Sequence, residues 1–168
     1  MKRHPSLHPL SRDHHHALVQ ARKLSLAAGD TDADALRRAA EHFADFWKSD
    51  LQAHFLQEEQ FVLQLLSPDS LEVRETLRQH NDIRRLVDEF GDNLARRQRI
   101  EASLLDALGE ALRLHIHFEE NELFPALESS ASEEELRRMN EQLEVTRSQS
   151  GHGGCALSPT PQATEAGQ

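Results

Sequence analysis

The chain has 168 residues and a net charge of −10 with histidine neutral, which suits one domain and argues against nucleic acid or an anionic membrane as the main partner. Its single cysteine, Cys155, excludes an intrachain disulfide and a cysteine-based metal cage. No apolar run approaches the ~20 residues of a membrane span, and the N-terminus lacks the apolar segment of a signal peptide, so we expect a cytoplasmic protein.

The composition favours an all-α protein, because Ala, Leu, Glu, Arg and Gln dominate and strand-forming residues are few. The first predicted helix runs from about Ser11 to Ala28. Its apolar stripe at helical spacing consists of Leu10, His14, Ala17, Leu18, Ala21, Leu24 and Ala28. Gly29 ends this helix, and Thr31 or Asp32 can cap the next one.

The second predicted helix runs from about Ala33 to Leu66. Its stripe consists of Leu36, Ala40, Phe43, Trp47, Leu51, His54, Glu58 and Leu65. Ser67 and Pro68 stop this helix and begin a third, with Ser67 as N-cap and Pro68 at the first position. The third stripe consists of Val73, Leu77, His80, Ile83, Leu86, Val87, Phe90 and Leu94. The end of the third helix is open, because Gly91 could break it while the helical pattern continues toward Arg97.

The fourth predicted helix covers roughly Ile100 to Glu128. Its stripe consists of Leu104, Leu108, Leu112, His115, Glu119 and Leu123. A capping box of Ser132 and Glu135 predicts a short fifth helix over Ser132–Val145, and the Gly-, Ser-, Pro- and Thr-rich composition from Ser148 is typical of a disordered tail. We therefore expect an up-down-up-down antiparallel four-helix bundle with a short fifth C-terminal helix over residues 1–147, followed by a tail over residues 148–168.

The pattern HxxxEE occurs twice, at residues 54–59 and 115–120, each time before an apolar run. Two such matches are close to chance in a chain so rich in His and Glu. Both matches, however, lie on the apolar stripe of their helix, and the other two helices each carry a lone His on the stripe, His14 and His80. Inward-facing carboxylates without partners are costly and repel each other, and Arg84 is the main candidate for a compensating cation in the chain itself. A bound metal cation would reverse that cost.

The positions of the turns test whether these histidines can lie at one level of a bundle. The midpoint of His14 and His54 is residue 34, and that of His54 and His80 is residue 67, both beside turns inferred independently. The midpoint of His80 and His115 places the third turn within residues 96–99. Four imidazoles and two carboxylates at one level suit two metal ions, each with about two His and bridged by both carboxylates, with iron, manganese or zinc as candidates.

At these residues the chain resembles the hemerythrin-like (HHE cation-binding) family over about residues 10–128. The matching pattern is a lone His in the first and third helices and HxxxE in the second and fourth, the latter followed by Leu-Phe-Pro. The resemblance implies a non-haem di-iron centre held by His14, His54, Glu58, His80, His115 and Glu119. It also implies that Glu58, Glu119 and an oxo or hydroxo group bridge the two irons.

One departure from the family pattern affects the functional expectation. Oxygen-carrying hemerythrins have a second His one turn after the third-helix His, where this chain has Arg84. The site therefore resembles the four-His, two-Glu version of bacterial hemerythrin-like proteins, and we expect a protein that binds or senses O₂, NO, peroxide or iron. Two alternatives remain: a di-iron enzyme acting on O₂ or peroxide, or in iron–sulfur cluster repair, and a metal-free structural or regulatory bundle.

Several residue assignments stay open. The helical phase favours His14 over His15 as the first-helix ligand, because His15 would place Arg22 in the core one period later. Glu59 and Glu120 flank the ligand face, where they either hydrogen-bond the ligand imidazoles or are solvated. No role follows from the sequence for the Arg96–Arg99 turn or for Cys155. The expected ligand at the metal site is a small diatomic molecule or peroxide, and the sequence identifies no protein partner.

Overall fold

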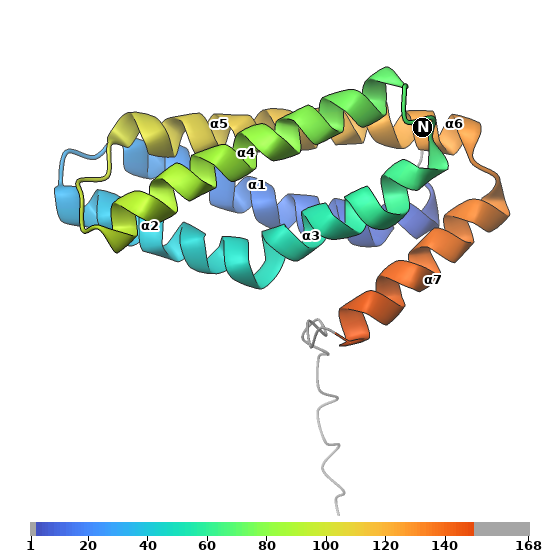
Figure 1. The fold of residues 1–168 in the computed structure, drawn as a ribbon, viewed down its shortest axis with the longest axis horizontal. Coiled ribbons are helices and arrows are strands. Elements are labelled where there is room, and N and C mark those ends of the chain that lie inside the picture. Colours follow the sequence, from blue (N-terminus) through green and yellow to red (C-terminus); the bar gives the residue numbers. More distant parts are fainter. Residues whose placement is uncertain (1–2, 150–168) are drawn as a thin grey trace, which may run out of the picture.

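A computed structural model describes residues 3–149, and all of its regular elements are helical (Figure 1), which confirms the all-α prediction for this part of the chain. The α-helices are α1 (His8–Ala28), α2 (Ala33–Phe46), α3 (Gln52–Gln57), α4 (Leu71–Ala95), α5 (Ala102–Phe118), α6 (Phe124–Ser130) and α7 (Glu133–Gln149). Short turns of 3₁₀-helix occur at η1 (Pro5–Leu7) and η4 (Leu63–Leu65). Turns of π-helix occur at η2 (Trp47–Leu51), η3 (Glu58–Val62) and η5 (Glu119–Leu123).

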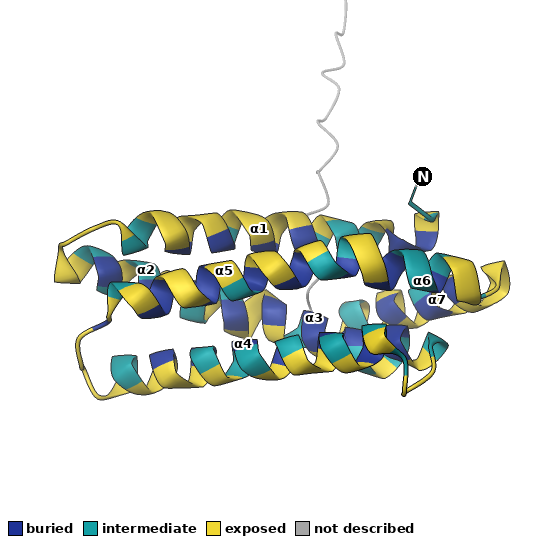
Figure 2. Ribbon diagram, turned by 90° about the horizontal axis from the view of Figure 1, so that it is seen from above, coloured by how far each residue is buried: buried dark blue, intermediate teal, exposed yellow. Residues whose placement is uncertain are grey.

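The helices pack into a bundle. Helix α1 packs against both α5 and α2, and α4 packs against both α5 and α2, so the four surround a common core (Figure 1). Buried residues recur along one side of α1, α4 and α5, with exposed residues on the other side (Figure 2). The last helix, α7, lies at one end of the bundle, where it contacts η1 and η3.

Three predicted connections can be compared with the structure. Asp32 caps α2 by accepting a hydrogen bond from the Asp34 N–H at 3.1 Å, as one of the two predicted caps. The prediction that Ser67 caps the third helix is wrong: Ser67 lies in a turn, and the Ser70 hydroxyl accepts from the Val73 N–H at 3.2 Å, so α4 begins three residues later than expected. The third turn falls within residues 96–99, as the midpoint argument predicted, and α4 runs through Gly91 without a break.

The turn after α4 closes without glycine. The Gln98 N–H bonds to the Asn93 carbonyl at 2.8 Å and the Arg97 N–H to the Leu94 carbonyl at 3.1 Å, which is the Schellman arrangement of a helix C-terminus. This arrangement needs a left-handed residue between the two helices, and Arg97 supplies it with φ of 54°. Glycine usually occupies that position, which is why turn residues alone left the end of this helix open.

The two HxxxE helices each widen by one residue at the glutamate. The Leu63 N–H bonds to the Glu58 carbonyl and the Phe124 N–H to the Glu119 carbonyl, five residues back instead of four. The extra residue shifts the buried face of the following segment. Leu65, predicted to lie on the stripe, is therefore only half-buried, while Leu63 is buried instead.

The core consists of two apolar clusters at the two ends of the bundle. One gathers residues of α1, α2, α4 and α5, including Leu24, Phe43, Phe90 and Leu108. The other gathers residues of η1, η3, η5, α6 and α7, including Leu7, Leu123, Leu127 and Leu143. Two apolar residues of the predicted stripes lie outside both clusters: Leu18 is 39% exposed and Leu77 is 37% exposed. The inward faces of their helices run instead through His14–Ala17–Ala21 and through Thr76–His80–Ile83.

The C-terminal helix is longer than expected. The capping box is present, with Ser132 and Glu135 exchanging backbone-to-side-chain hydrogen bonds of 2.8 and 3.3 Å. Helix α7 then continues to Gln149, four residues beyond the helix end predicted at Val145. The rest of the predicted tail, including Cys155, lies outside the described residues. Within residues 3–149, no helix combines the length and the apolar character that crossing a membrane requires.

The close contact between α1 and α5 gives a testable prediction. A Cβ atom on Gly109 would lie 2.8 Å from the Ala21 carbonyl oxygen, a backbone atom that cannot move aside without shifting α1. Gly109→Ala should lower the free energy of unfolding by about 1–3 kcal/mol, measured by urea denaturation. Gly91→Ala is the matched control, because no atom lies within 4 Å of its Cβ position on the exposed face of α4. This control should be neutral or stabilising by up to ~1 kcal/mol. Equal effects of the two substitutions would contradict this account of the α1–α5 contact.

Candidate metal centre

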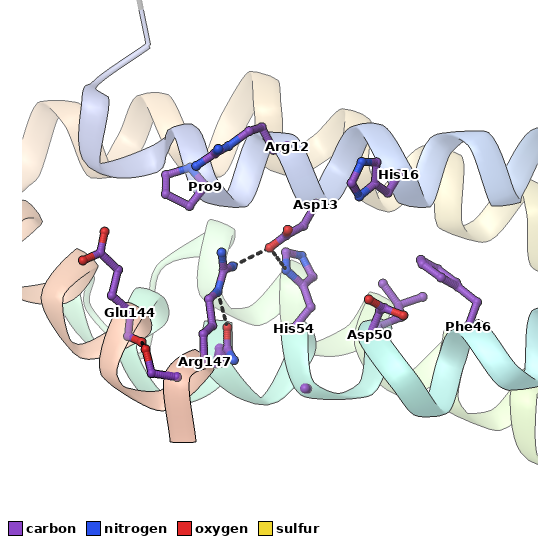
Figure 3. Close-up of a pocket in the computed structure, with 13 residues that line it drawn as sticks. Pro9, Arg12, Asp13, His16, Phe46, Asp50, His54, Glu144 and Arg147 are labelled. Carbon is purple, nitrogen blue, oxygen red and sulfur yellow. Dashed lines mark hydrogen bonds and ion pairs between the residues drawn. The ribbon is translucent and has the colours of Figure 1, made fainter. Parts of the chain in front are cut away.

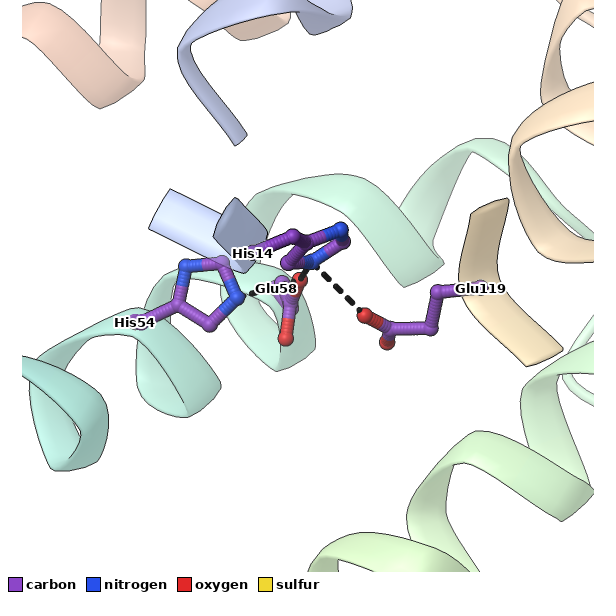
Figure 4. A group of neighbouring side chains, drawn as sticks. All are labelled: His14, His54, Glu58 and Glu119. Carbon is purple, nitrogen blue, oxygen red and sulfur yellow. Dashed lines mark ion pairs between the residues drawn. The ribbon is translucent and has the colours of Figure 1, made fainter. Parts of the chain in front are cut away.

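The six residues predicted as metal ligands lie together in a buried layer of the bundle. They form two groups of four, in each of which one potential ligand atom per residue lies within 4.8 Å of the others. The first group is His14, His54, Glu58 and Glu119 (Figure 4), and the second is Glu58, His80, His115 and Glu119. Both carboxylates belong to both groups, so the groups describe two adjacent positions that share Glu58 and Glu119.

Local helix geometry places each of these side chains. His54 and Glu58 are one turn apart, as are His115 and Glu119, and residues four apart on a helix lie on the same face. Helices α1 and α4 supply the lone imidazoles of His14 and His80. The layer lies between the two apolar clusters. Along both α1 and α4, the residues of one cluster lie before the lone His and those of the other cluster lie after it.

The distances within the layer are short. The Nε2 atom of His14 lies 3.0 Å from Glu119 Oε2 and 3.5 Å from Glu58 Oε1, and His54 Nε2 lies 3.0 Å from Glu58 Oε1. In the second group, His80 Nε2 lies 3.3 Å from Glu58 Oε2, and His115 Nε2 lies 3.5 Å from Glu119 Oε2.

These contacts do not have hydrogen-bond geometry. Among the described residues, both carboxylate oxygens of Glu58 and Glu119 are buried without a hydrogen-bond partner, as are the Nε2 atoms of His14, His80 and His115. Buried polar atoms are rarely left in this state, and each unpaired carboxylate is costly. Two ligand atoms bonded at ~2.1 Å to one ion are themselves roughly 3 Å apart, so these separations fit one metal ion in each group, with the two carboxylates common to both.

The outer nitrogen of each imidazole faces an oxygen atom of another side chain, and three of the four, those of His14, His80 and His115, are within hydrogen-bond distance of it. His14 Nδ1 lies 2.7 Å from Glu120 Oε1, and His80 Nδ1 lies 2.7 Å from Glu59 Oε1, so these two glutamates contact the imidazoles rather than being simply solvated. An acceptor at Nδ1 keeps the proton there and leaves the Nε2 lone pair pointing into the layer, as metal-binding histidines require.

Sequence reasoning missed the other two partners of the outer nitrogens. His54 Nδ1 lies 3.5 Å from Asp13 Oδ2, and His115 Nδ1 lies 3.1 Å from Gln79 Oε1. A signal was present in the sequence, because Asp13 and Gln79 each directly precede a lone histidine. Their partners are far away in the chain, however, so the spacing alone could not reveal the contacts.

Three arginines pair with the outer carboxylates. Arg3 lies 3.0 Å from Glu120, Arg84 lies 2.8 Å from Glu59, and Arg147 of α7 forms an ion pair with Asp13. The sequence suggested Arg84 as a compensating cation beside the buried carboxylates. The structure instead places it outside that layer, with 28% of its side chain exposed and its charge directed at Glu59.

A protein-family comparison agrees with this geometry. The family model of the hemerythrin HHE cation binding domain matches residues 6–127. The chain belongs to this family. Neither a curated protein nor a solved structure matches the chain. Membership of an HHE cation-binding family and the buried His and Glu cluster both indicate a metal-binding domain.

Close packing of like and unlike charges in this HHE domain shifts the pKa values of the buried histidines and glutamates. Burial alone would lower the pKa of His54, but the Glu58 charge and contact with Asp13 raise it to about 9. Burial and the charge of Glu58 both raise the pKa of Glu119. Burial and the neighbouring charge of His80 lower the pKa of His115 well below its usual value. Without a metal, protons bound to the buried side chains must therefore balance the negative charge of the carboxylates.

The His54 side of the centre borders a pocket of about 610 Å³ between α1, the segment from Phe46 to Gln57, and α7. Asp13 and His54 form part of its wall (Figure 3). Arg147 reaches from α7 toward Asp13 and also donates to Gln57 Oε1 at 3.2 Å. The C-terminal helix is thus connected to the environment of a candidate ligand.

The protonation of the cluster predicts how the metal-free protein responds to pH. The pKa of His54 is about 9 in the folded chain, compared with an ordinary value of 6.5. Protonated His54 therefore stabilises the fold fully below pH ~6.5, and this contribution, up to about 3 kcal/mol, is lost as the pH rises through 9. His14 and His80 are shifted in the same direction by their carboxylate neighbours.

Urea unfolding with a chelator present, below pH 6.5 and above pH 9, measures this dependence. The free energy of unfolding should be lower at the higher pH. Stability that is constant or higher above pH 9 would contradict the charge balance inferred for the buried layer.

Proposed function

We propose that this protein binds two iron ions in its HHE domain and uses them to bind or sense O₂, NO, peroxide or iron itself. The observation that carries the proposal is the pair of overlapping four-residue groups with both carboxylates in common. Imidazole and carboxylate ligands without thiolate suit iron, with manganese or zinc as possible occupants of the same positions. A metal-free bundle would leave two fully buried carboxylates, without hydrogen-bond partners, to be balanced by protons alone, which is costly.

In this proposal, different residues of the chain would have different roles at the metal site. His14 and His54 would hold one ion and His80 and His115 the other, while Glu58 and Glu119 would contact both. The Nδ1 partners would orient the four imidazoles, and the two apolar clusters would exclude water from the layer. Iron bound there would supply positions for a small ligand and a change of oxidation state.

We further propose that the four long helical stretches alternate in direction as an up-down-up-down bundle. The packing of α1 and α4 against both α2 and α5 supports this topology, as do the short connections between consecutive stretches. Ligand residues from all four stretches then meet at one level. Alternation also explains why the midpoints between successive histidines fall at turns.

Metal content after expression with added iron tests the proposal and the choice of first-helix ligand together. His14 is 2% exposed within the layer, whereas the adjacent His15 is exposed. The unmodified chain should contain about two irons, with charge-transfer absorption in the near ultraviolet. His15→Ala should retain this content, and His14→Ala should lose about half of it or more. Metal content near zero in the unmodified chain, after anaerobic loading with Fe(II), would refute the proposal.

The two shared carboxylates allow a second test of the site, in which Glu58 is compared with an exposed glutamate. Glu58→Ala should remove most of both ions, because Glu58 belongs to both groups, and should lower stability, because metal binding contributes to folding. Glu122→Ala is a suitable control, since Glu122 is exposed in the equivalent wide turn of the other half. Both variants are compared by metal analysis and by thermal unfolding with and without chelator. Normal loading of the Glu58 variant would show that the site is wrongly assigned.

A further inference from the structure

The candidate metal centre is built from two similar halves of the chain. Each half supplies a lone His, on α1 or α4, and then a HxxxEE segment. The second Glu of each segment contacts the lone His of the other half: Glu59 contacts His80, and Glu120 contacts His14. These two contacts have equal lengths of 2.7 Å, so this part of the arrangement is symmetric.

The remaining contact of each half breaks the symmetry. In both halves the residue before the lone His faces the HxxxE imidazole of the same half. In the first half this residue is Asp13, beside His54. In the second half it is Gln79, beside His115. A carboxylate in one half therefore corresponds to a neutral amide in the other.

The orientation of the Gln79 amide is fixed by its second contact. Its Nε2 atom donates to Glu75 Oε1 at 2.7 Å, and Arg78 holds the Glu75 carboxylate in place. The Gln79 oxygen must then face His115 Nδ1, as observed at 3.1 Å. His115 is thereby held in the same tautomer as His14 and His80, but by a group without net charge.

The difference has a direct consequence for cation binding. A carboxylate close to Nδ1 makes the imidazole a stronger electron donor, and its charge attracts the ion. Asp13 lies 3.5 Å from His54 Nδ1, at ion-pair distance without hydrogen-bond geometry, so it acts here through its charge. The His14–His54 position has two carboxylates behind its imidazoles, Glu120 and Asp13, whereas the His80–His115 position has one, Glu59. Each of the three carboxylates has one arginine partner, so arginine pairing does not cancel the difference.

We propose that the two ion positions are unequal and that the residues at 13 and 79 set their order. The first ion enters the His14–His54 position, and the second binds more weakly beside His80 and His115. This inference rests on the proposed two-ion function, and it assigns Asp13 and Gln79 as positioning residues that act through the imidazoles.

Titration of the metal-free full-length chain with Mn(II) tests the order of binding. Free Mn(II) is followed by electron paramagnetic resonance, and heat is followed by calorimetry. The unmodified chain should bind two ions in two steps whose affinities differ by roughly 10–100-fold, the usual effect of such supporting contacts. His115→Ala should retain one ion at the affinity of the first step. His54→Ala should retain one ion at the weaker affinity.

A charge-relocating variant tests the role of residue 79. Gln79→Glu combined with Glu75→Gln keeps the net charge of the chain and lets the new Gln side chain donate to the new Glu. The second step should strengthen roughly tenfold relative to Glu75→Gln alone, which is the matched control. Asp13→Asn should weaken the first step and bring the two affinities together. Circular dichroism checks that each variant is folded, and Gln79→Glu alone provides a second test if the double variant is not.

The outcomes separate this inference from the proposed function. Absence of Mn(II) and Fe(II) binding by the unmodified chain would overturn the two-ion function and the inference with it. Two ions bound with equal affinity, unchanged by the substitutions at positions 13 and 79, would overturn the inference and leave the two-ion function standing. Tighter binding by the His54→Ala chain than by the His115→Ala chain would reverse the proposed order and overturn it as well.

Discussion

Two carboxylates fully buried at one level of a helical bundle are the constraint on which the rest of this structure depends. Glu58 and Glu119 have no exposed surface and no hydrogen-bond partner among the described residues. Such groups repel each other and cannot be hydrated, so the fold must bring positive charge to them. Imidazoles from four helical stretches place their nitrogen atoms at that level, and apolar clusters lie on both sides of it. The arginines stay farther out, where they neutralise the carboxylates behind the imidazoles.

Much of this arrangement was predictable because the relevant signals are periodic. The helical stripe selects His14 over its neighbours, and the spacing of successive histidines places the turns, including one closed by Arg97 without a glycine. A bundle of amphipathic helices allows few alternatives once the polar residues must meet at one level. Whether these residues bind metal remains a prediction, since burial and proximity make a site possible but do not load it.

Other features depend on contacts that no local pattern encodes. The wide turns after Glu58 and Glu119 shift the buried face by one residue, so a uniform helical period misplaces Leu65. Asp13 and Gln79 contact imidazoles on other helices, and only the assembled bundle brings them together. Ser70 rather than Ser67 caps α4 because a tight turn precedes the helix, and either serine suits that role by composition.

The C-terminal helix lies outside the family match but packs into the core of the structure. The family match ends at residue 127, yet α7 begins at Glu133 and places Leu136, Met139 and Leu143 in the core cluster beside the buried His and Glu layer. Its Arg147 also holds Asp13, the residue behind His54. A shortened chain cut at the family boundary would therefore expose an apolar face and release one of the groups that orient the centre. For this protein, the segment to express and compare with relatives extends at least to the end of α7.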